Sequence, residues 1–169
     1  IYSFINGAKD AVEEYNNPNL FENEAYKYAA IRYIEKTKGK KNVEFLINNH
    51  VQLLKKNINC KLVIVGDGPD LDSYKKLTVK NKISDKVIFT GKVDWQEVPI
   101  YYNIADIFVT ASNTETQGLT VIEAMAAGVP PLCIDDDSFR GTVTDELNGR
   151  VFKNQEEYLA KLSNILPDS

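Results

Sequence analysis

Histidine, methionine and tryptophan each occur only once in this sequence of 169 residues, and cysteine occurs twice. Cys60 and Cys133 each lie in an apolar, strand-like run, which predicts two buried thiols in a reducing compartment rather than a disulfide or a pair of metal ligands. His50 lies among helix-forming residues, so we expect its side chain on the surface of a helix, without a catalytic role. We therefore predict neither a metal site nor a bound cofactor.

Long apolar runs and an excess of positive charge are also lacking. No run comes near the roughly 20 apolar residues that a helix needs to span a bilayer. The net charge of −4 and the isoelectric point near 5.1 argue against a nucleic-acid-binding protein. The remaining composition, 43% hydrophobic and 26% charged residues, is typical of an ordinary globular protein with one core.

Apolar, β-branched runs alternate with stretches of helical periodicity along most of the chain. Lys61–Val65 is the clearest strand, because its nearly unbroken apolar run suits a parallel strand that is covered on both faces. Asn42 is the expected N-cap of the helix before it, and Pro99 fits the first turn of a later helix. Strands are predicted at 61–65, 86–91, 106–110, 129–134 and 150–152, and helices at 43–56, 70–80, 95–104 and 155–165. This alternation predicts an α/β fold with a Rossmann-like parallel sheet sandwiched by helices.

The stretch 113–130 contains the most informative pattern in the chain. A polar turn with Glu115 follows the strand at 106–110, and a short helix is expected from Gly118 to Gly128. Its apolar residues share one face, and Glu123 falls on another, about two turns beyond Glu115. The members of that apolar face are Leu119, Ile122, Met125 and Ala126.

The start of this helix predicts an anion site with carboxylates beside it. The backbone N–H groups of Gly118, Leu119 and Thr120 have no preceding turn to bond to, and such helix ends attract phosphate. Carboxylates beside a phosphate make sense when the ligand also carries hydroxyl groups, as a ribose and a sugar do. The alternative is a buried helix with two incidental surface glutamates.

The pattern Glu-x7-Glu, closed by Glu-Ala-Met-Ala-x-Gly-x-Pro, resembles the donor-binding domain of retaining glycosyltransferases of the two-domain GT-B type. The fuller stretch Ala-Ser-x-Thr-Glu-Thr-Gln-Gly-Leu-Thr-x-Ile-Glu-Ala-Met-Ala-Ala-Gly looks most like bacterial diacylglycerol glucosyltransferases, which make membrane glucolipids from UDP-glucose. The resemblance therefore implies one half of a GT-B fold and a nucleotide-sugar donor as substrate.

The resemblance also assigns roles to the two glutamates and their neighbours. Glu123 would accept hydrogen bonds from the ribose hydroxyls. Glu115 would be the catalytic residue, in contact with the hydroxyls of the donor sugar and the charge that develops at its anomeric carbon. The backbone at Gly118, Leu119 and Thr120 would meet the diphosphate and the sugar, and the turn at Val93 would hold the uracil through its main chain.

Two further loops follow strands and would complete the donor site. Lys41 matches the family's lysine on the diphosphate, whereas Lys36 and Glu35 stand where the family has arginine and glycine. Lysine keeps the charge but lacks the bidentate fork of arginine, so this departure puts the strength of donor binding in doubt. Gly66 and Gly68 would allow close approach of the backbone to the ligand. The alternatives are a solvated lysine-rich surface for 36–41 and a plain turn for 66–69.

The domain organisation is predicted partly from register with the family. Local propensity allows a helix over 22–35, but family register favours a strand at 31–34. We divide the chain into a connecting segment, residues 1–28, and a Rossmann-like nucleotide-sugar-binding domain, residues 29–169. A separate family match, formed by Gly141, Asp145, Asn148 and Gly149, is interpreted as a structural turn.

The resemblance covers about residues 31–166 and only the second domain of a GT-B enzyme. We therefore expect this chain to be part of a longer enzyme, in which a missing N-terminal domain binds a lipid acceptor. The whole enzyme would be cytoplasmic and peripheral at the inner face of the membrane, and the chain alone would transfer nothing. Alternatives are a transferase for capsule, exopolysaccharide or glycoprotein, and a non-catalytic nucleotide-sugar-binding module. A dinucleotide-binding domain is disfavoured, because Leu71 stands where Gly-x-Gly-x-x-Gly needs its third glycine.

Overall fold

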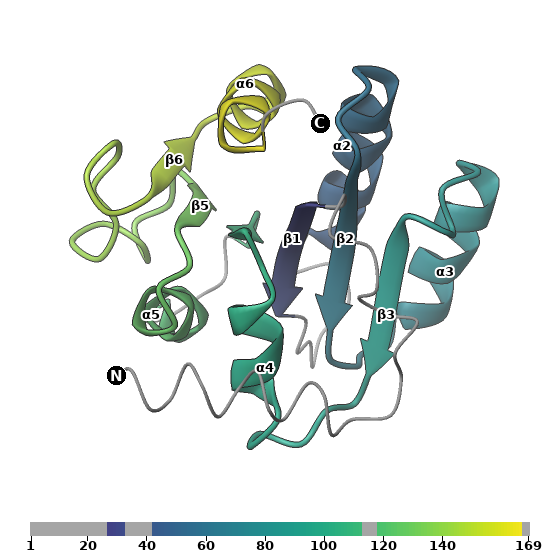
Figure 1. The fold of residues 1–169 in the computed structure, drawn as a ribbon, viewed down its shortest axis with the longest axis horizontal. Coiled ribbons are helices and arrows are strands. Elements are labelled where there is room, and N and C mark those ends of the chain that lie inside the picture. The colour runs from purple at the N-terminus through teal and green to yellow at the C-terminus, as the bar shows by residue number, and fades with distance from the viewer. Residues whose placement is uncertain (1–26, 33–41, 113–117, 167–169) are drawn as a thin grey trace.

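The computed structural model describes residues 27–32, 42–112 and 118–166. Within these residues, strands and helices alternate along the chain as the sequence predicts, except that the last two strands follow one another (Figure 1). They are β1 (Lys27–Arg32), α2 (Val43–Lys55), β2 (Cys60–Val65), α3 (Leu71–Lys80), β3 (Val87–Gly91), α4 (Val98–Asn103), β4 (Ile107–Thr110), α5 (Leu119–Ala126), β5 (Pro131–Ile134), β6 (Arg150–Phe152) and α6 (Gln155–Ile165).

The strands form one sheet in the order β3-β2-β1-β4-β5-β6, and all neighbouring strands are parallel. The predicted Rossmann-like α/β fold is thus confirmed. The chain builds the sheet outward from β1 to β3, then returns to the middle and builds outward again from β4 to β6. The switch point between the two halves lies between β1 and β4, and in open parallel sheets ligands bind beyond the carboxyl ends of the strands at such a point.

The side chains of the inner strands β2, β4 and β5 alternate between apolar layers on the two faces of the sheet. In β4, Ile107 and Val109 pack into the larger core, which α2, α3 and α6 cover, whereas Phe108 packs into the layer under α4 and α5. Leu132 and Cys133 of β5 divide in the same way. Because both faces are covered, these strands need apolar residues at every position, which explains their continuous apolar runs.

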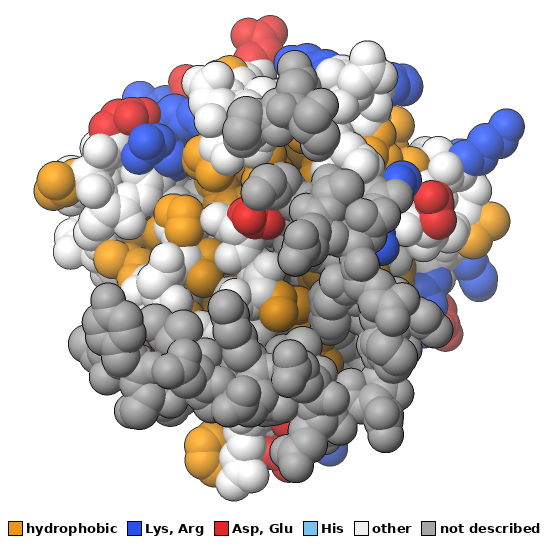
Figure 2. Space-filling view, in the orientation of Figure 1, with side chains coloured by type: hydrophobic (Ala, Val, Ile, Leu, Met, Phe, Trp, Pro, Cys, Tyr) orange, Lys and Arg blue, Asp and Glu red, His pale blue; other side chains and the backbone are white. Residues whose placement is uncertain are grey.

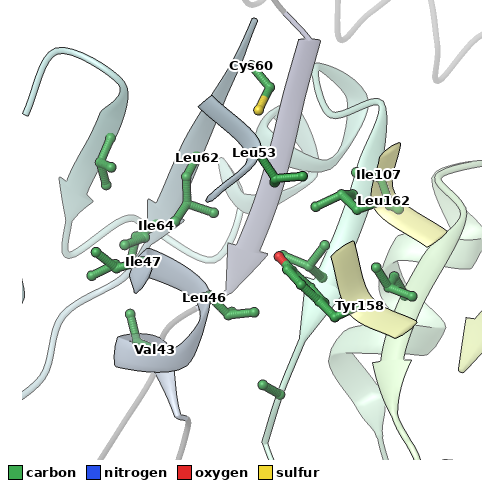
Figure 3. Packing of buried hydrophobic residues seen from close by; sticks show 14 of the residues in the cluster. Val43, Leu46, Ile47, Leu53, Cys60, Leu62, Ile64, Ile107, Tyr158 and Leu162 are labelled. Atoms are coloured by element: carbon green, nitrogen blue, oxygen red, sulfur yellow. The ribbon is translucent and has the colours of Figure 1, made fainter. Parts of the chain in front are cut away.

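Aromatic rings form one end of the larger core. Phe152 of β6 stacks on Phe45 of α2 with ring centroids 5.8 Å apart, and it meets Tyr158 of α6 edge-on at 5.0 Å. Tyr158 is 2% exposed and lies toward Leu162 and Leu46 (Figure 3). These contacts join α2 and α6 across the sheet edge where β6 ends.

Two predictions need correction: the position of the first strand and the side-chain cap at Asn42. Within the described residues the first strand is β1, Lys27–Arg32, not 31–34, and its pairing with β2 begins at Lys27. Asn42 does occupy the N-cap position of α2, but its backbone is left-handed, with φ 52°, and its side chain makes no capping hydrogen bond. A capping side chain normally requires an extended backbone at this position.

His50 is not a surface residue but is buried in the core, with 2% of its surface exposed. The inward face of α2 extends over this position, and the Nδ1 atom of His50 lies 3.8 Å from Sγ of Cys60. Burial lowers the pKa of His50 to about 4, so the ring is neutral near pH 7. Both cysteines are free and buried as predicted, and burial raises the pKa of each thiol to about 12.

Helix α4 is shorter than the helix predicted at 95–104. Pro99 lies in the first turn of α4, but this helix begins at Val98 rather than at residue 95. The reason is a local turn, in which Oδ1 and the carbonyl oxygen of Asp94 accept hydrogen bonds from the backbone of Gln96 and Glu97.

The turn before β6 has the structural role predicted for it. Oδ1 of Asp145 accepts a 2.8 Å hydrogen bond from the backbone of Val151, and Oδ1 of Asn148 accepts one of 2.7 Å from Thr144. A Cβ atom at Gly149 would lie 2.8 Å from Cγ of Pro131, so only glycine fits there. The turn therefore fixes the entry of the chain into β6.

The apolar face predicted for α5 points outward. The residues that α5 buries are Val121 and Ala124, whereas Leu119 and Ile122 are 58% and 46% exposed. Hydrophobic side chains accordingly reach the surface over the region of α5 and β5 (Figure 2).

Candidate functional site

The turns after β2 and β3 are joined at the carboxyl edge of the sheet. Gly66 and Gly91 form an isolated antiparallel bridge, and the backbone N–H of Gly66 donates to Oγ1 of Thr90 at 3.2 Å. Both glycines have positive φ, 119° and 70°, which a side chain would disfavour. The backbone N–H of Gly68 donates to Oδ1 of Asp67 at 2.8 Å. These two N–H groups are engaged within the protein, so this turn supplies shape and close backbone approach rather than donors.

In the turn after β3, Val93 packs against the protein whereas Trp95 is exposed. Val93 is half-buried and packs against the apolar layer under α4 and α5. The Asp94 turn that delays the start of α4 follows it directly, and Trp95 projects from this turn with 75% of its surface exposed. The predicted base-binding turn is therefore a compact segment at the sheet edge with a large apolar ring beside it.

The N-terminus of α5 is formed at Gly118, as predicted. Gly118 is buried and left-handed, with φ 58°, and a Cβ atom there would lie 3.1 Å from the ring of Phe139. The loop after β5, which carries Phe139, thus packs directly on the start of α5. The first hydrogen bond of α5 runs from the backbone N–H of Val121 to the carbonyl oxygen of Gly118, at 2.9 Å. The backbone N–H groups of Leu119 and Thr120 come before it, at the N-terminus of the helix.

Glu123 is exposed on the second turn of α5 and has a defined partner. Its Oε2 accepts a 2.9 Å hydrogen bond from the hydroxyl of Tyr102, which also lies 3.1 Å from the carbonyl oxygen of Thr120. The hydroxyl has one hydrogen, and a charged carboxylate is the stronger acceptor of the two. Tyr102 is 4% exposed and packs on Phe108, with ring centroids 5.6 Å apart, so the carboxylate is oriented by a buried ring.

Sequence reasoning did not identify Tyr102 or Trp95 as parts of this region. Together with Glu123, they line a pocket of about 350 Å³ between α4 and α5. The remaining lining is apolar: Val98 and Pro99 of α4, Ala126 at the end of α5, and Ala127, which follows it. One signal was available, since Trp95 is the only tryptophan and follows the predicted base-binding turn by two residues.

The sequence model for "Glycosyl transferases group 1" matches residues 5–169 of this chain. The chain belongs to this glycosyltransferase family. The predicted family is therefore confirmed, and the sheet is one half of a GT-B fold.

The relatives of this glycosyltransferase chain agree with the resemblance found in its motifs. It is 41% identical over 125 residues to "Alpha-monoglucosyldiacylglycerol synthase" of Acholeplasma laidlawii, covering 74% of the chain and 31% of the relative. The protein of the same name from Streptococcus pneumoniae is 34% identical over 126 residues, covering 75% of the chain and 29% of the relative. The chain thus spans about a third of the length of these relatives. Among solved structures, WaaG, a glycosyltransferase involved in lipopolysaccharide biosynthesis, matches with a TM-score of 0.74 at 22% identity, covering 91% of this chain and 41% of WaaG.

Three predicted site residues of this chain lie outside the described residues: Lys36, Lys41 and Glu115. Lys36 and Lys41 follow β1, Glu115 follows β4, and these two strands are neighbours at the middle of the sheet. Their roles stay predictions.

Neither a metal-binding cluster nor a membrane-spanning helix occurs within the described ranges. They contain no group of three or more histidine, cysteine, aspartate and glutamate side chains that would hold a metal ion. In the same ranges, no helix has the length and apolar character needed to cross a bilayer.

Proposed function

We propose that this chain binds the nucleotide-sugar donor of a retaining glycosyltransferase, and that the donor is UDP-glucose. The observation that carries the proposal is the carboxylate of Glu123, one turn beyond the N-terminus of α5, which Tyr102 holds at a pocket between α4 and α5. A fixed carboxylate next to a helix N-terminus suits a ligand with both hydroxyl groups and phosphates.

Each part of the donor has a matching part of the site in this proposal. The diphosphate lies at the N-terminus of α5, where the leading N–H groups favour negative charge. The ribose hydroxyls donate to Glu123, one turn further along the helix. The uracil lies at the turn around Val93, and Lys36, Lys41 and Glu115 complete the phosphate and sugar contacts from the loops after β1 and β4.

The proposed acceptor is diacylglycerol, which the reaction converts to a glucolipid. This proposal is supported by the two relatives at 41% and 34% identity, both of them alpha-monoglucosyldiacylglycerol synthases. Because the chain spans about a third of their length, we assign the acceptor site to a separate domain. We further propose that the enzyme is cytoplasmic and peripheral at the inner face of the membrane, where its lipid acceptor is found.

The first test concerns the base. If main-chain groups at the Val93 turn recognise uracil, UDP should bind at least tenfold more tightly than ADP or GDP, about 1.4 kcal/mol. Isothermal titration of the chain with the three nucleotides measures this difference. Equal affinities for all three would remove the uridine assignment while leaving nucleotide binding intact.

The second test concerns the ribose. Glu123→Gln keeps the shape of the side chain and removes its charge, so UDP affinity should fall by about 1–3 kcal/mol. Tyr102→Phe should weaken binding less, because it removes only the group that orients the carboxylate. If Tyr102 acts through Glu123, its loss should matter little in the Glu123→Gln background, as a double-mutant cycle would measure.

Glu156→Gln, at an exposed position of α6 on the opposite layer, is the matched control and should leave UDP affinity unchanged. The thermal midpoint of Glu123→Gln should stay close to that of the wild type, since the side chain is exposed. A large drop in that midpoint with unchanged UDP affinity would mean that Glu123 is structural and that the ribose contact is wrong.

A further inference from the structure

The side chain of Trp95, the largest apolar side chain of the protein, is mostly exposed to water. It is 75% exposed, although burying such a ring is normally favourable. The position is set by the backbone, because the Asp94 turn holds residues 94–97 together before α4 begins. The ring is therefore presented at the sheet edge by an ordered turn.

The pocket next to Trp95 has two different kinds of wall. Val98, Pro99 and Ala126 make it largely apolar, whereas the Glu123 carboxylate, fixed by Tyr102, is an acidic group at its border. Its volume of about 350 Å³ lies in the range of small-molecule sites. A flat apolar ring, an apolar floor and one oriented hydrogen-bond acceptor together match a nucleoside, whose base is flat and whose ribose donates hydroxyl hydrogens.

We propose that the indole of Trp95 stacks on the nucleobase of the donor and forms one wall of its pocket. This inference rests on the proposed function and extends it, because it assigns the base contact to a side chain as well as to the main chain at Val93. Stacking on an aromatic ring favours every base, since each has a π face. Trp95 therefore contributes affinity for the nucleoside, while the Val93 turn selects uracil.

The only tryptophan in the sequence is Trp95, so selective excitation of tryptophan reports on this one ring. UDP should quench or shift its emission, and ribose 5-phosphate, which lacks a base, should not. Trp95→Ala should weaken UDP binding roughly tenfold or more in calorimetric titration, because one base–aromatic stack is lost. The same variant should bind ribose 5-phosphate as the wild type does, and Trp95→Phe should retain part of the UDP affinity. Leu147→Ala, at another exposed apolar residue outside this pocket, is the matched control and should change neither value.

The outcomes separate this inference from the proposed function. If calorimetry detects UDP binding while the tryptophan emission and the affinity of Trp95→Ala stay unchanged, the stacking role is wrong and the donor-binding function stands. If Trp95→Ala weakens UDP and ribose 5-phosphate equally, the loss is structural and the stacking role is again overturned. If the wild-type chain binds no UDP at all, the proposed uridine-nucleotide function fails, and the inference fails with it.

Discussion

Phe152→Ala is expected to lower the free energy of unfolding by about 3–5 kcal/mol. Phe152 is 1% exposed and lies between two rings, stacked on Phe45 and edge-on to Tyr158. Truncation would remove both ring contacts and leave a cavity where α2, β6 and α6 meet. The edge of the sheet offers little backbone movement to fill it, because the turn before β6 is fixed by its own hydrogen bonds.

Chemical denaturation followed by circular dichroism measures this change. Leu147→Ala is the control of the same type at a residue that is 80% exposed, and we expect it to alter stability by less than about 0.5 kcal/mol. Phe152→Leu should fall between the two, since it keeps much of the apolar volume. A loss below about 1 kcal/mol for Phe152→Ala would contradict the packing of the three rings.

The inner strands and the helix termini near glycine could be predicted because their signals are local. β2 and β4 are covered on both faces, so burial imposes an apolar residue at nearly every position and the run stands out in the sequence. Gly118 and Gly128 both adopt positive φ at the two ends of α5, a conformation that glycine favours strongly. No knowledge of the rest of the fold is needed to interpret these features.

The position predicted for the first described strand was wrong because the local sequence signal there is ambiguous. The sequence of β1, KYAAIR, contains residues that also favour helix, and its pairing with β2 and β4 decides the outcome. Those partners lie more than 30 residues away in the sequence, so tertiary context overrides local propensity. The burial of His50 has a similar origin. It depends on which face of α2 packs over Cys60, and the helical periodicity alone does not determine that.

The candidate site shows the same division between local and long-range information. Glu123 and the N-terminus of α5 follow from one short motif, and the turn at Val93 follows from the end of a strand. By contrast, the contact between Tyr102 and Glu123 joins residues 21 positions apart on two helices, and their meeting depends on how α4 and α5 pack. The sequence alone therefore indicated the carboxylate but not the group that orients it.

In the full-length enzyme, Glu115→Gln is expected to lower kcat by on the order of 100-fold, or a few kcal/mol of activation free energy. Transfer with retention passes through a positively charged, oxocarbenium-like sugar, which a nearby carboxylate can stabilise and orient. Glu115 is the one acidic residue between β4 and α5, three residues before the left-handed Gly118 at which the helix begins. In the proposed arrangement the diphosphate docks at this helix N-terminus, so the attached glucose lies toward the Glu115 turn.

The contrast between the two glutamates is the sharpest test of these roles. UDP carries no sugar, so Glu115→Gln should leave UDP affinity close to the wild-type value, whereas Glu123→Gln should reduce it. Steady-state glucosyl transfer to diacylglycerol and calorimetric titration with UDP, measured on both variants, give the four values required. If Glu115→Gln kept normal turnover but lost UDP binding, the sugar would not lie over this turn. Glu115 would then contact the nucleotide, and the carboxylate that stabilises the reacting sugar would have to come from elsewhere in the enzyme.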